Sequence, residues 1–201
     1  MPWLPSTNQV EWIKAVVFVG CLVPLGRLVY GAFAGNLGAN PIETITRSTG
    51  WWTLFLLSAT LAVTPLRKLS GANWLLRLRR MLGLFAFFYA SAHFTTFIWF
   101  DHWFDAGEIV KDVIKRPFVT VGFAAFVLLL PLAATSTNAM VRRLGRNWQR
   151  LHRLVYAIAV LGVLHFWWLV KRDLTEPVIF ALVVAALLAL RAFPRPLRSR
   201  V

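Results

Sequence analysis

The stretch QRLHRLVYAIAVLGVLHFWW, residues 149–168, places His152 and His165 near the two ends of one apolar run. Between them, residues 154–164 carry no charged side chain. Ionisable groups inside a bilayer are costly, so each one is by default a functional hypothesis. The chain has four histidines, and two of them lie here. Because neutral imidazole is a ligand of metals and of haem iron, this stretch predicts one wall of a haem site in a membrane helix.

The composition is typical of a membrane protein. Of the 201 residues, 58% are hydrophobic and only 15% are charged, and several windows approach the ~20 apolar residues that cross a bilayer. The net charge of +14 does not indicate nucleic-acid binding, because nearly all of it lies in short connections between apolar runs. The single cysteine, Cys21, excludes a disulfide framework, a cysteine metal cluster and thioether-linked haem.

The apolar runs predict an all-α membrane protein that forms one domain over residues 1–201. Six transmembrane helices are expected, at about 10–34, 49–66, 81–100, 117–134, 151–170 and 177–192. The first run could instead be a cleaved signal peptide, since residues 32–34 read Ala-Phe-Ala, but Glu11 at its start and the five later runs favour a retained helix. Residues 35–47 resemble a loop, and Thr64-Pro65 marks the predicted exit of the second helix.

The basic residues predict the orientation of these helices. Lys and Arg number fourteen in the 66–81 connection, the 136–153 stretch and the C-terminal tail together, against six in the alternate connections. The positive-inside rule therefore makes the first set cytoplasmic, with both termini on that side. Seven of the eight acids fall on the opposite side. We expect a multi-pass membrane protein, in contact with the lipids of its bilayer.

Orientation and helical rise place two histidines at one depth. At ~1.5 Å per residue, His93 lies ~20 Å along the third helix from Arg80, and His165 lies ~20 Å along the fifth helix from His152. Two neutral imidazoles at one depth on separate helices can bind one haem iron from opposite faces. We therefore expect His93 and His165 to be axial ligands. The alternative for either residue alone is a packed polar side chain, hydrogen-bonded across helices.

His152 has no comparable partner. The position about 13 residues before His93 is Arg80, and arginine is always protonated and is not an axial ligand. His152 could therefore bind a second cofactor or a quinone headgroup, or lie in the interface beside Arg153. A 13-residue step leaves a rotation of ~220° beyond whole turns, so His152 and His165 share a face only if the helix is bulged, for example near Gly162.

One further histidine, His102, follows the third run beside Asp101 and Trp103. We expect it to be a surface residue.

Several motifs resemble a known family. The string TSTNAMVRRLGRNWQRLHRLVY, residues 135–156, followed by LHFWW, resembles the ferric-reductase-type transmembrane domain and, within that superfamily, the MsrQ family, formerly YedZ. The resemblance continues through VEWIKAVVF, LGANPIETITRSTG, TPLRKL, RLRRMLGLFAF and KRPFVTVG and covers nearly the whole chain. MsrQ-like proteins are the haem-binding membrane subunits of the bacterial methionine sulfoxide reductase system MsrPQ.

The resemblance implies cofactors and partners that spacing does not reveal. It implies that the protein binds haem b and FMN. It also implies that the protein takes electrons from the quinone pool or from a cytosolic flavin reductase. These electrons pass to MsrP, a periplasmic molybdopterin enzyme that repairs oxidised proteins. The histidines that matter in the family fall on His93, His152 and His165. Two-haem members of the superfamily have a further histidine where this chain has Arg80, which leaves room for a flavin in place of a second haem.

The resemblance therefore implies an electron-transfer subunit of a bacterial inner membrane, whose partner carries the sulfoxide chemistry, with no catalytic residue of its own. FMN or a quinone is expected near His152. Its phosphate or headgroup would meet one or more of four arginines, because guanidinium groups suit phosphate: Arg77, Arg79, Arg80 and Arg142. Positive-inside topology alone also explains these arginines. Two other functions remain open, a transmembrane ferric or cupric reductase and a small transporter or scaffold with no redox role.

Overall fold

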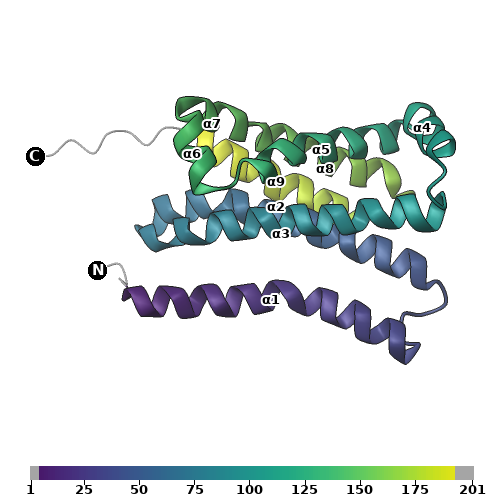
Figure 1. The fold of residues 1–201 in the computed structure, drawn as a ribbon, viewed down its shortest axis with the longest axis horizontal. Coiled ribbons are helices and arrows are strands. Elements are labelled where there is room, and N and C mark those ends of the chain that lie inside the picture. The colour runs from purple at the N-terminus through teal and green to yellow at the C-terminus, as the bar shows by residue number, and fades with distance from the viewer. Residues whose placement is uncertain (1–4, 193–201) are drawn as a thin grey trace, which may run out of the picture.

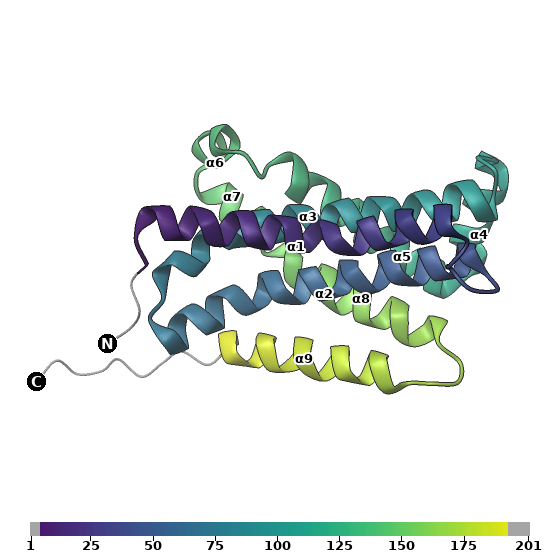
Figure 2. The same ribbon diagram turned by 90° about the horizontal axis from the view of Figure 1, so that it is seen from below.

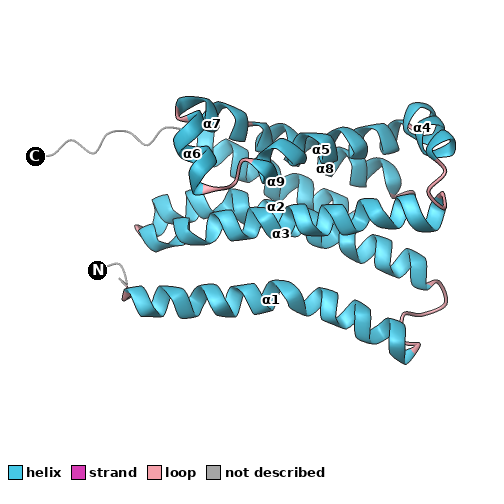
Figure 3. Cartoon of the chain, viewed as in Figure 1, coloured by secondary structure: helices cyan, strands magenta, loops and turns pink. Residues whose placement is uncertain are grey.

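The computed structural model describes residues 5–192, and every regular element in that range is a helix (Figure 3). The long helices are α1 (Thr7–Ala34), α2 (Pro41–Ser70), α3 (Leu76–Thr96), α5 (Pro117–Ala134), α8 (Leu154–Leu169) and α9 (Thr175–Ala192). The short elements are the 3-10 turn η1 (Asn73–Leu75), the π-helical turn η2 (Phe97–Asp101), α4 (Ala106–Lys115), α6 (Asn138–Leu144) and α7 (Arg146–His152).

Helix α2 begins earlier than the sequence predicts. The side chain of Asn40 accepts a hydrogen bond from the backbone N–H of Glu43, and Pro41 occupies the first turn, where its missing N–H costs nothing. These two residues start the helix at residue 41, so the loop expected over residues 35–47 is only partly a loop. The helix ends at Ser70 and is capped by Gly71, whose φ of 74° is left-handed and favours glycine.

The predicted exit of the second helix at Thr64-Pro65 is wrong, because α2 continues through Pro65 to Ser70. A proline inside a helix removes the N–H that would bond the carbonyl four residues before it. That carbonyl belongs to Leu61, and it accepts a hydrogen bond from Nη2 of Arg191 at 2.7 Å. A side chain from α9 thus replaces the missing backbone donor.

The fifth expected helix, at about 151–170, is divided in two. Its N-terminal part is α7, which ends at His152, and α8 starts after Arg153. The interruption therefore lies at Arg153, and α8 runs as a regular α-helix past Gly162. The connections predicted over residues 101–116 and 135–150 contain the short helices α4, α6 and most of α7.

Five segments are long and apolar enough to cross a membrane, as a multi-pass membrane protein requires. They are Thr7–Ala34, Pro41–Ser70, Asn73–Asp101, Pro117–Ala134 and Arg146–Leu169. The sixth expected helix is present as α9 and packs against α2 and α8. It is not among these five, so its crossing of the membrane stays a prediction.

The long helices run side by side in one bundle (Figures 1 and 2). The closest pairs are α2 with α3 and α5 with α8, whereas α1 contacts α2 and α3 along one side. One end of the bundle carries α4 and is called the α4 end. The other carries α6 and α7 and is called the α6 end; α1 begins there and α9 finishes there. The two ends of the described chain thus share a side, and its assignment to the cytoplasm remains a prediction.

The buried core lies between α2, α3, α5 and α8. Ala86 and Ala159 are fully buried, as is Tyr89, and Ile158 is 1% exposed. Small residues at such positions let membrane helices approach closely. Large apolar side chains on the outside, such as Phe33 and Val16, are exposed, which suits a surface in contact with lipid.

Candidate functional site

His93 of α3 and His165 of α8 meet inside the bundle. The centroids of their rings are 6.1 Å apart, and the ring planes cross at 76°. The depth argument from the sequence predicts that these two residues lie at one level, and the structure brings them together. Both side chains line the same cavity.

Each imidazole is oriented by a backbone carbonyl of a neighbouring helix. Nδ1 of His93 lies 2.9 Å from the carbonyl oxygen of Thr46 in α2, and Nδ1 of His165 lies 2.7 Å from that of Phe118 in α5. A carbonyl only accepts, so each Nδ1 carries the proton and donates. The lone pair is then on Nε2, and neither Nε2 hydrogen-bonds to another described residue. Metal-binding histidines are oriented in this way.

Two glycines make room for these rings. A Cβ added to Gly50 of α2 would lie 3.1 Å from the His93 ring, and one added to Gly122 of α5 would lie 2.7 Å from Nδ1 of His165. The rings therefore pack directly on the backbone of the helices whose carbonyls hold them. A larger residue at Gly122 would force His165 to move.

The distance between the rings fits a metal held between them. Two imidazoles on opposite sides of one metal ion, each ~2 Å from it, place their centroids ~6 Å apart. Within residues 5–192 no group of three or more His, Cys, Asp or Glu side chains forms a metal site. A pair of histidines alone suits a metal whose other ligands come from a macrocycle such as haem. These residues fit a haem.

The cavity that holds the two histidines has a volume of ≈ 1000 Å³, at the upper end of the ~300–1,000 Å³ of ligand pockets. Its deep part is apolar and aromatic: Leu54, Leu57, Phe94, Phe123, Phe126, Leu129 and Ile158. Toward the α4 end its lining becomes charged: Glu43, Arg47, Asp101, Lys171, Arg172, Asp173 and Glu176. The cavity thus joins an apolar interior to a charged end.

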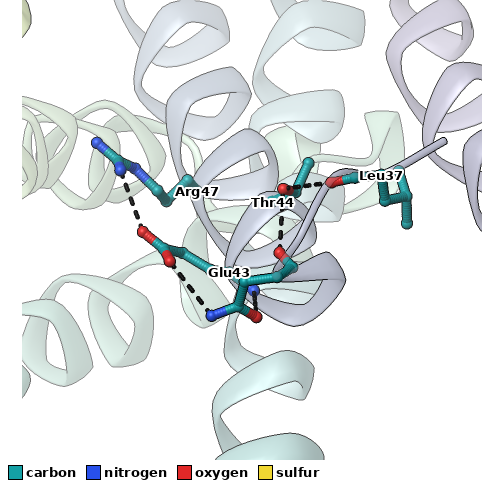
Figure 4. A network of polar contacts seen from close by, with 5 residues as sticks. Leu37, Glu43, Thr44 and Arg47 are labelled. Carbon is teal, nitrogen blue, oxygen red and sulfur yellow. Dashed lines mark hydrogen bonds and ion pairs between the residues drawn. The ribbon is translucent and has the colours of Figure 1, made fainter.

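A polar network organises this charged end at the start of α2 (Figure 4). The Glu43 carboxylate accepts hydrogen bonds from Nη1 of Arg47 at 3.2 Å and from the Asn40 amide at 3.3 Å. The Thr44 hydroxyl lies 2.9 Å from the carbonyl of Leu37 and 3.1 Å from that of Asn40. The network fixes the first turn of α2 just before Thr46, whose carbonyl orients His93.

His152 lies at the α6 end, away from this cavity. Its Nδ1 lies 3.1 Å from the carbonyl of Trp148, and its ring stacks on that indole at 3.8 Å between centroids. Its Nε2 is buried and forms no well-aligned hydrogen bond with a described residue, although the backbone of Leu132 also lies close to the ring. His152 is therefore a histidine oriented by backbone groups, and it does not contribute to the His93–His165 pair.

The four arginines predicted to meet an anion have different surroundings. Arg77 and Arg142 are exposed, and Nη1 of Arg80 donates to Oδ1 of Asn138 at 2.7 Å. Arg79 alone is half-buried and lies within electrostatic range of His152. Sequence reasoning missed Arg191, which it counted among the basic residues of the tail. The signal that could have found it is Pro65, which leaves a carbonyl of α2 without its helical donor.

His102 is not the surface residue that the sequence predicts. Its side chain is 10% exposed, and its Nε2 lies 3.2 Å from Oδ2 of Asp112 in α4. Its ring packs on Phe97 of η2, with centroids 4.6 Å apart. His102 therefore joins α4 to the end of the third membrane segment.

Comparison with known proteins gives one consistent set of relatives. The family described as "Ferric reductase like transmembrane component" matches residues 49–163. A protein of Herminiimonas arsenicoxydans named "Protein-methionine-sulfoxide reductase heme-binding subunit MsrQ" is 62% identical over 196 residues, which cover 96% of this chain and 90% of that protein. A protein with the same name from Ralstonia nicotianae is 55% identical, over 96% of this chain and 90% of that protein. Another from Azospira oryzae is 53% identical, over 97% of this chain and 84% of that protein.

Proposed function

This chain belongs to the MsrQ family within the ferric reductase-like transmembrane proteins, and we propose that it is a b-type cytochrome subunit. It carries electrons across the bacterial inner membrane to a periplasmic methionine sulfoxide reductase of the MsrP type, and so supports the repair of oxidised periplasmic proteins. The sulfoxide chemistry takes place on that partner, a molybdopterin enzyme, and not on this chain.

The observation that carries this proposal is the His93–His165 pair. Both imidazoles line one apolar cavity, both are oriented through Nδ1, and both leave Nε2 for an iron. A haem bound there supplies a one-electron carrier inside the membrane. The apolar walls exclude water from it, and the charged lining at the α4 end lies where the partner would approach.

Electrons enter at the α6 end, in our proposal, from the quinone pool or from a cytosolic flavin reductase. FMN or a quinone occupies the inner half near His152. Two features support this part: the buried Nε2 of His152, which forms no well-aligned hydrogen bond with a described residue, and the half-buried Arg79, whose charge lies within electrostatic range of that ring.

The visible spectrum of the purified protein tests the haem. We expect a Soret band in the wild type and its loss in His93→Ala and in His165→Ala, because each change removes one axial ligand. His102→Ala is the matched control and should keep the full absorbance per protein, since His102 does not line the cavity. A Soret band that survives in both ligand variants would overturn the assignment.

Re-oxidation of the reduced haem separates the rival functions. We expect an MsrP-type partner with methionine sulfoxide to re-oxidise it faster than ferric or cupric complexes do. Equal or faster re-oxidation by the metal complexes would instead support a metal reductase, and a wild-type preparation without a Soret band would support a transporter or scaffold.

A further inference from the structure

A group of large exposed apolar side chains lies at the α4 end of the bundle, outside the histidine-lined cavity (Figures 1 and 2). Its members come from the end of the third membrane segment, from the turn that follows it and from α4. We call this set the α4 patch: Trp99, Trp103, Phe104, Val110 and Ile114. Exposed apolar side chains grouped in this way mark a surface that another molecule covers.

Helix α4 carries its apolar and its charged residues on different sides. At ~100° per residue, Val110 and Ile114 lie ~40° apart around the helix axis, whereas Glu108 lies ~160° from Val110. Val110 is 56% exposed and Ile114 is 75% exposed. The apolar side of α4 is therefore only partly covered by the rest of the chain.

The contacts of Asp112 fix which side of α4 faces outward. Its Oδ2 lies 3.2 Å from Nε2 of His102, and both side chains are nearly buried. Asp112 lies ~160° around the helix from Val110 and from Ile114. The side of α4 that carries Asp112 is thus joined to the bundle, and the side that carries the patch faces away from it.

Helix lengths place α4 at the edge of the hydrocarbon core of a bilayer. Helix α5 has 18 residues, so at ~1.5 Å per residue it is ~27 Å long, close to the ~30 Å of that core. Its first residue, Pro117, lies three positions after Ile114. Ile114 therefore lies at the depth where the apolar faces of interfacial helices enter a bilayer.

The turn before α4 holds two aromatic residues in a conformation that disfavours them. The φ of Trp103 is 46° and that of Phe104 is 63°, in the left-handed region where a helix usually ends in glycine. Trp103 is 77% exposed and Phe104 is 63% exposed, so packing inside the protein offsets little of this strain. An apolar surrounding outside the protein would offset it.

This turn continues the side of the third membrane segment. The ring centroid of Phe104 lies 6.3 Å from that of Trp99, which is exposed and belongs to the segment Asn73–Asp101. Tryptophan is enriched where membrane helices reach the headgroups, because its ring is apolar and its N–H is polar. The patch is therefore continuous with a surface that already faces lipid.

The lysines of α4 also suit phospholipid headgroups. Lys111 pairs with Glu108 at 3.0 Å, whereas Lys115 forms no ion pair within residues 5–192. A lysine beside an apolar helix face keeps its stem on the apolar surface and extends its ammonium group to the headgroup phosphates.

We infer that α4 and the turn before it lie in the headgroup region of the bilayer, with the α4 patch against the acyl chains of phospholipids. Helix α4 is thus an anchor in the plane of the membrane and does not span it. This inference depends on the membrane class of the chain and not on the proposed haem or electron-transfer function.

Site-directed fluorescence tests the anchor. In a Cys21→Ala background, the fluorophore NBD is attached to Val110→Cys, to Ile114→Cys or to the control Glu108→Cys. The proteins are placed in vesicles of phosphatidylcholine and phosphatidylglycerol that contain a phosphatidylcholine with a nitroxide near the top of its acyl chain. We expect the nitroxide to quench the two patch labels at least ~2-fold more strongly than the Glu108 label, because only the apolar face enters the bilayer. Iodide in the water should show the opposite order.

The three labelled positions are exposed, so no label displaces a packed side chain. The surface ion pair that Glu108→Cys removes contributes little to stability. Each labelled protein should therefore unfold at the temperature of the Cys21→Ala protein.

Two results would overturn the anchor. In one, iodide quenches the patch labels as strongly as the Glu108 label, which would place the patch in water. In the other, iodide reaches the patch labels until a soluble MsrP-type protein is added and then no longer does, which would assign the patch to a protein partner. Neither result depends on whether haem is bound, so a failure of the haem proposal stays separate.

Discussion

At the scale of single residues, the candidate haem site depends on groups that do not touch the cofactor. The carbonyls of Thr46 and Phe118 select the tautomer of His93 and His165, and so decide which nitrogen is available to iron. Gly50 and Gly122 let the rings reach those carbonyls. Each histidine thus needs a partner helix with a glycine and a backbone carbonyl at the right height.

Gly122→Ala should lower haem loading several-fold, because the new Cβ would lie 2.7 Å from Nδ1 of His165 and push the ring off the Phe118 carbonyl. Soret absorbance per protein measures this. Gly50→Ala should have a smaller effect, since its Cβ would lie 3.1 Å from His93.

Gly20→Ala is the control for both changes, because a Cβ there meets no atom within 4 Å. It should leave haem loading unchanged. If Gly122→Ala and Gly20→Ala bind the same amount of haem per protein, the close approach of Gly122 to His165 is not needed for haem binding.

At the scale of elements, the Tyr89 hydroxyl of α3 forms hydrogen bonds with the backbone of α1. Pro24 lies inside α1, and the N–H of the next residue, Leu25, donates to the Tyr89 hydroxyl at 3.2 Å. The same hydroxyl donates to the carbonyl of Cys21 at 2.7 Å. One side chain of α3 therefore satisfies two backbone groups of α1, in a setting where lipid offers no replacement.

Tyr89→Phe should destabilise the protein by about 1–3 kcal/mol, because it removes both hydrogen bonds that join α3 to the backbone of α1. Thermal unfolding in detergent measures the change. Tyr30→Phe, at an exposed position of α1, is the control and should unfold like the wild type. If the two variants unfold at the same temperature, the hydroxyl bridge does not hold α1.

At the scale of the whole molecule, the distribution of charge predicts that the α6 end is cytoplasmic. Cys21 is the only cysteine, so a Cys21→Ala protein is a background for single labels. Lys111→Cys in α4 should react with a membrane-impermeant maleimide in intact spheroplasts. Arg143→Cys in α6 should react only after permeabilisation. The reverse pattern would invert the topology and the direction of electron transfer.

The sequence by itself determined the membrane class, the existence of the long helices and the equal depth of His93 and His165. These properties follow from local hydrophobicity and from the fixed rise of a helix. It misjudged the helix ends at Asn40 and Pro65, where a cap and a distant arginine decide whether the helix continues.

Only the tertiary structure decided which side chains face one another. The orienting carbonyls, the glycines under the rings, the His102–Asp112 contact and the Arg191–Leu61 hydrogen bond all involve residues on different elements. Periodicity along one helix carries no information about the rotation of its neighbours. The packing of buried side chains sets that rotation, and with it both candidate sites.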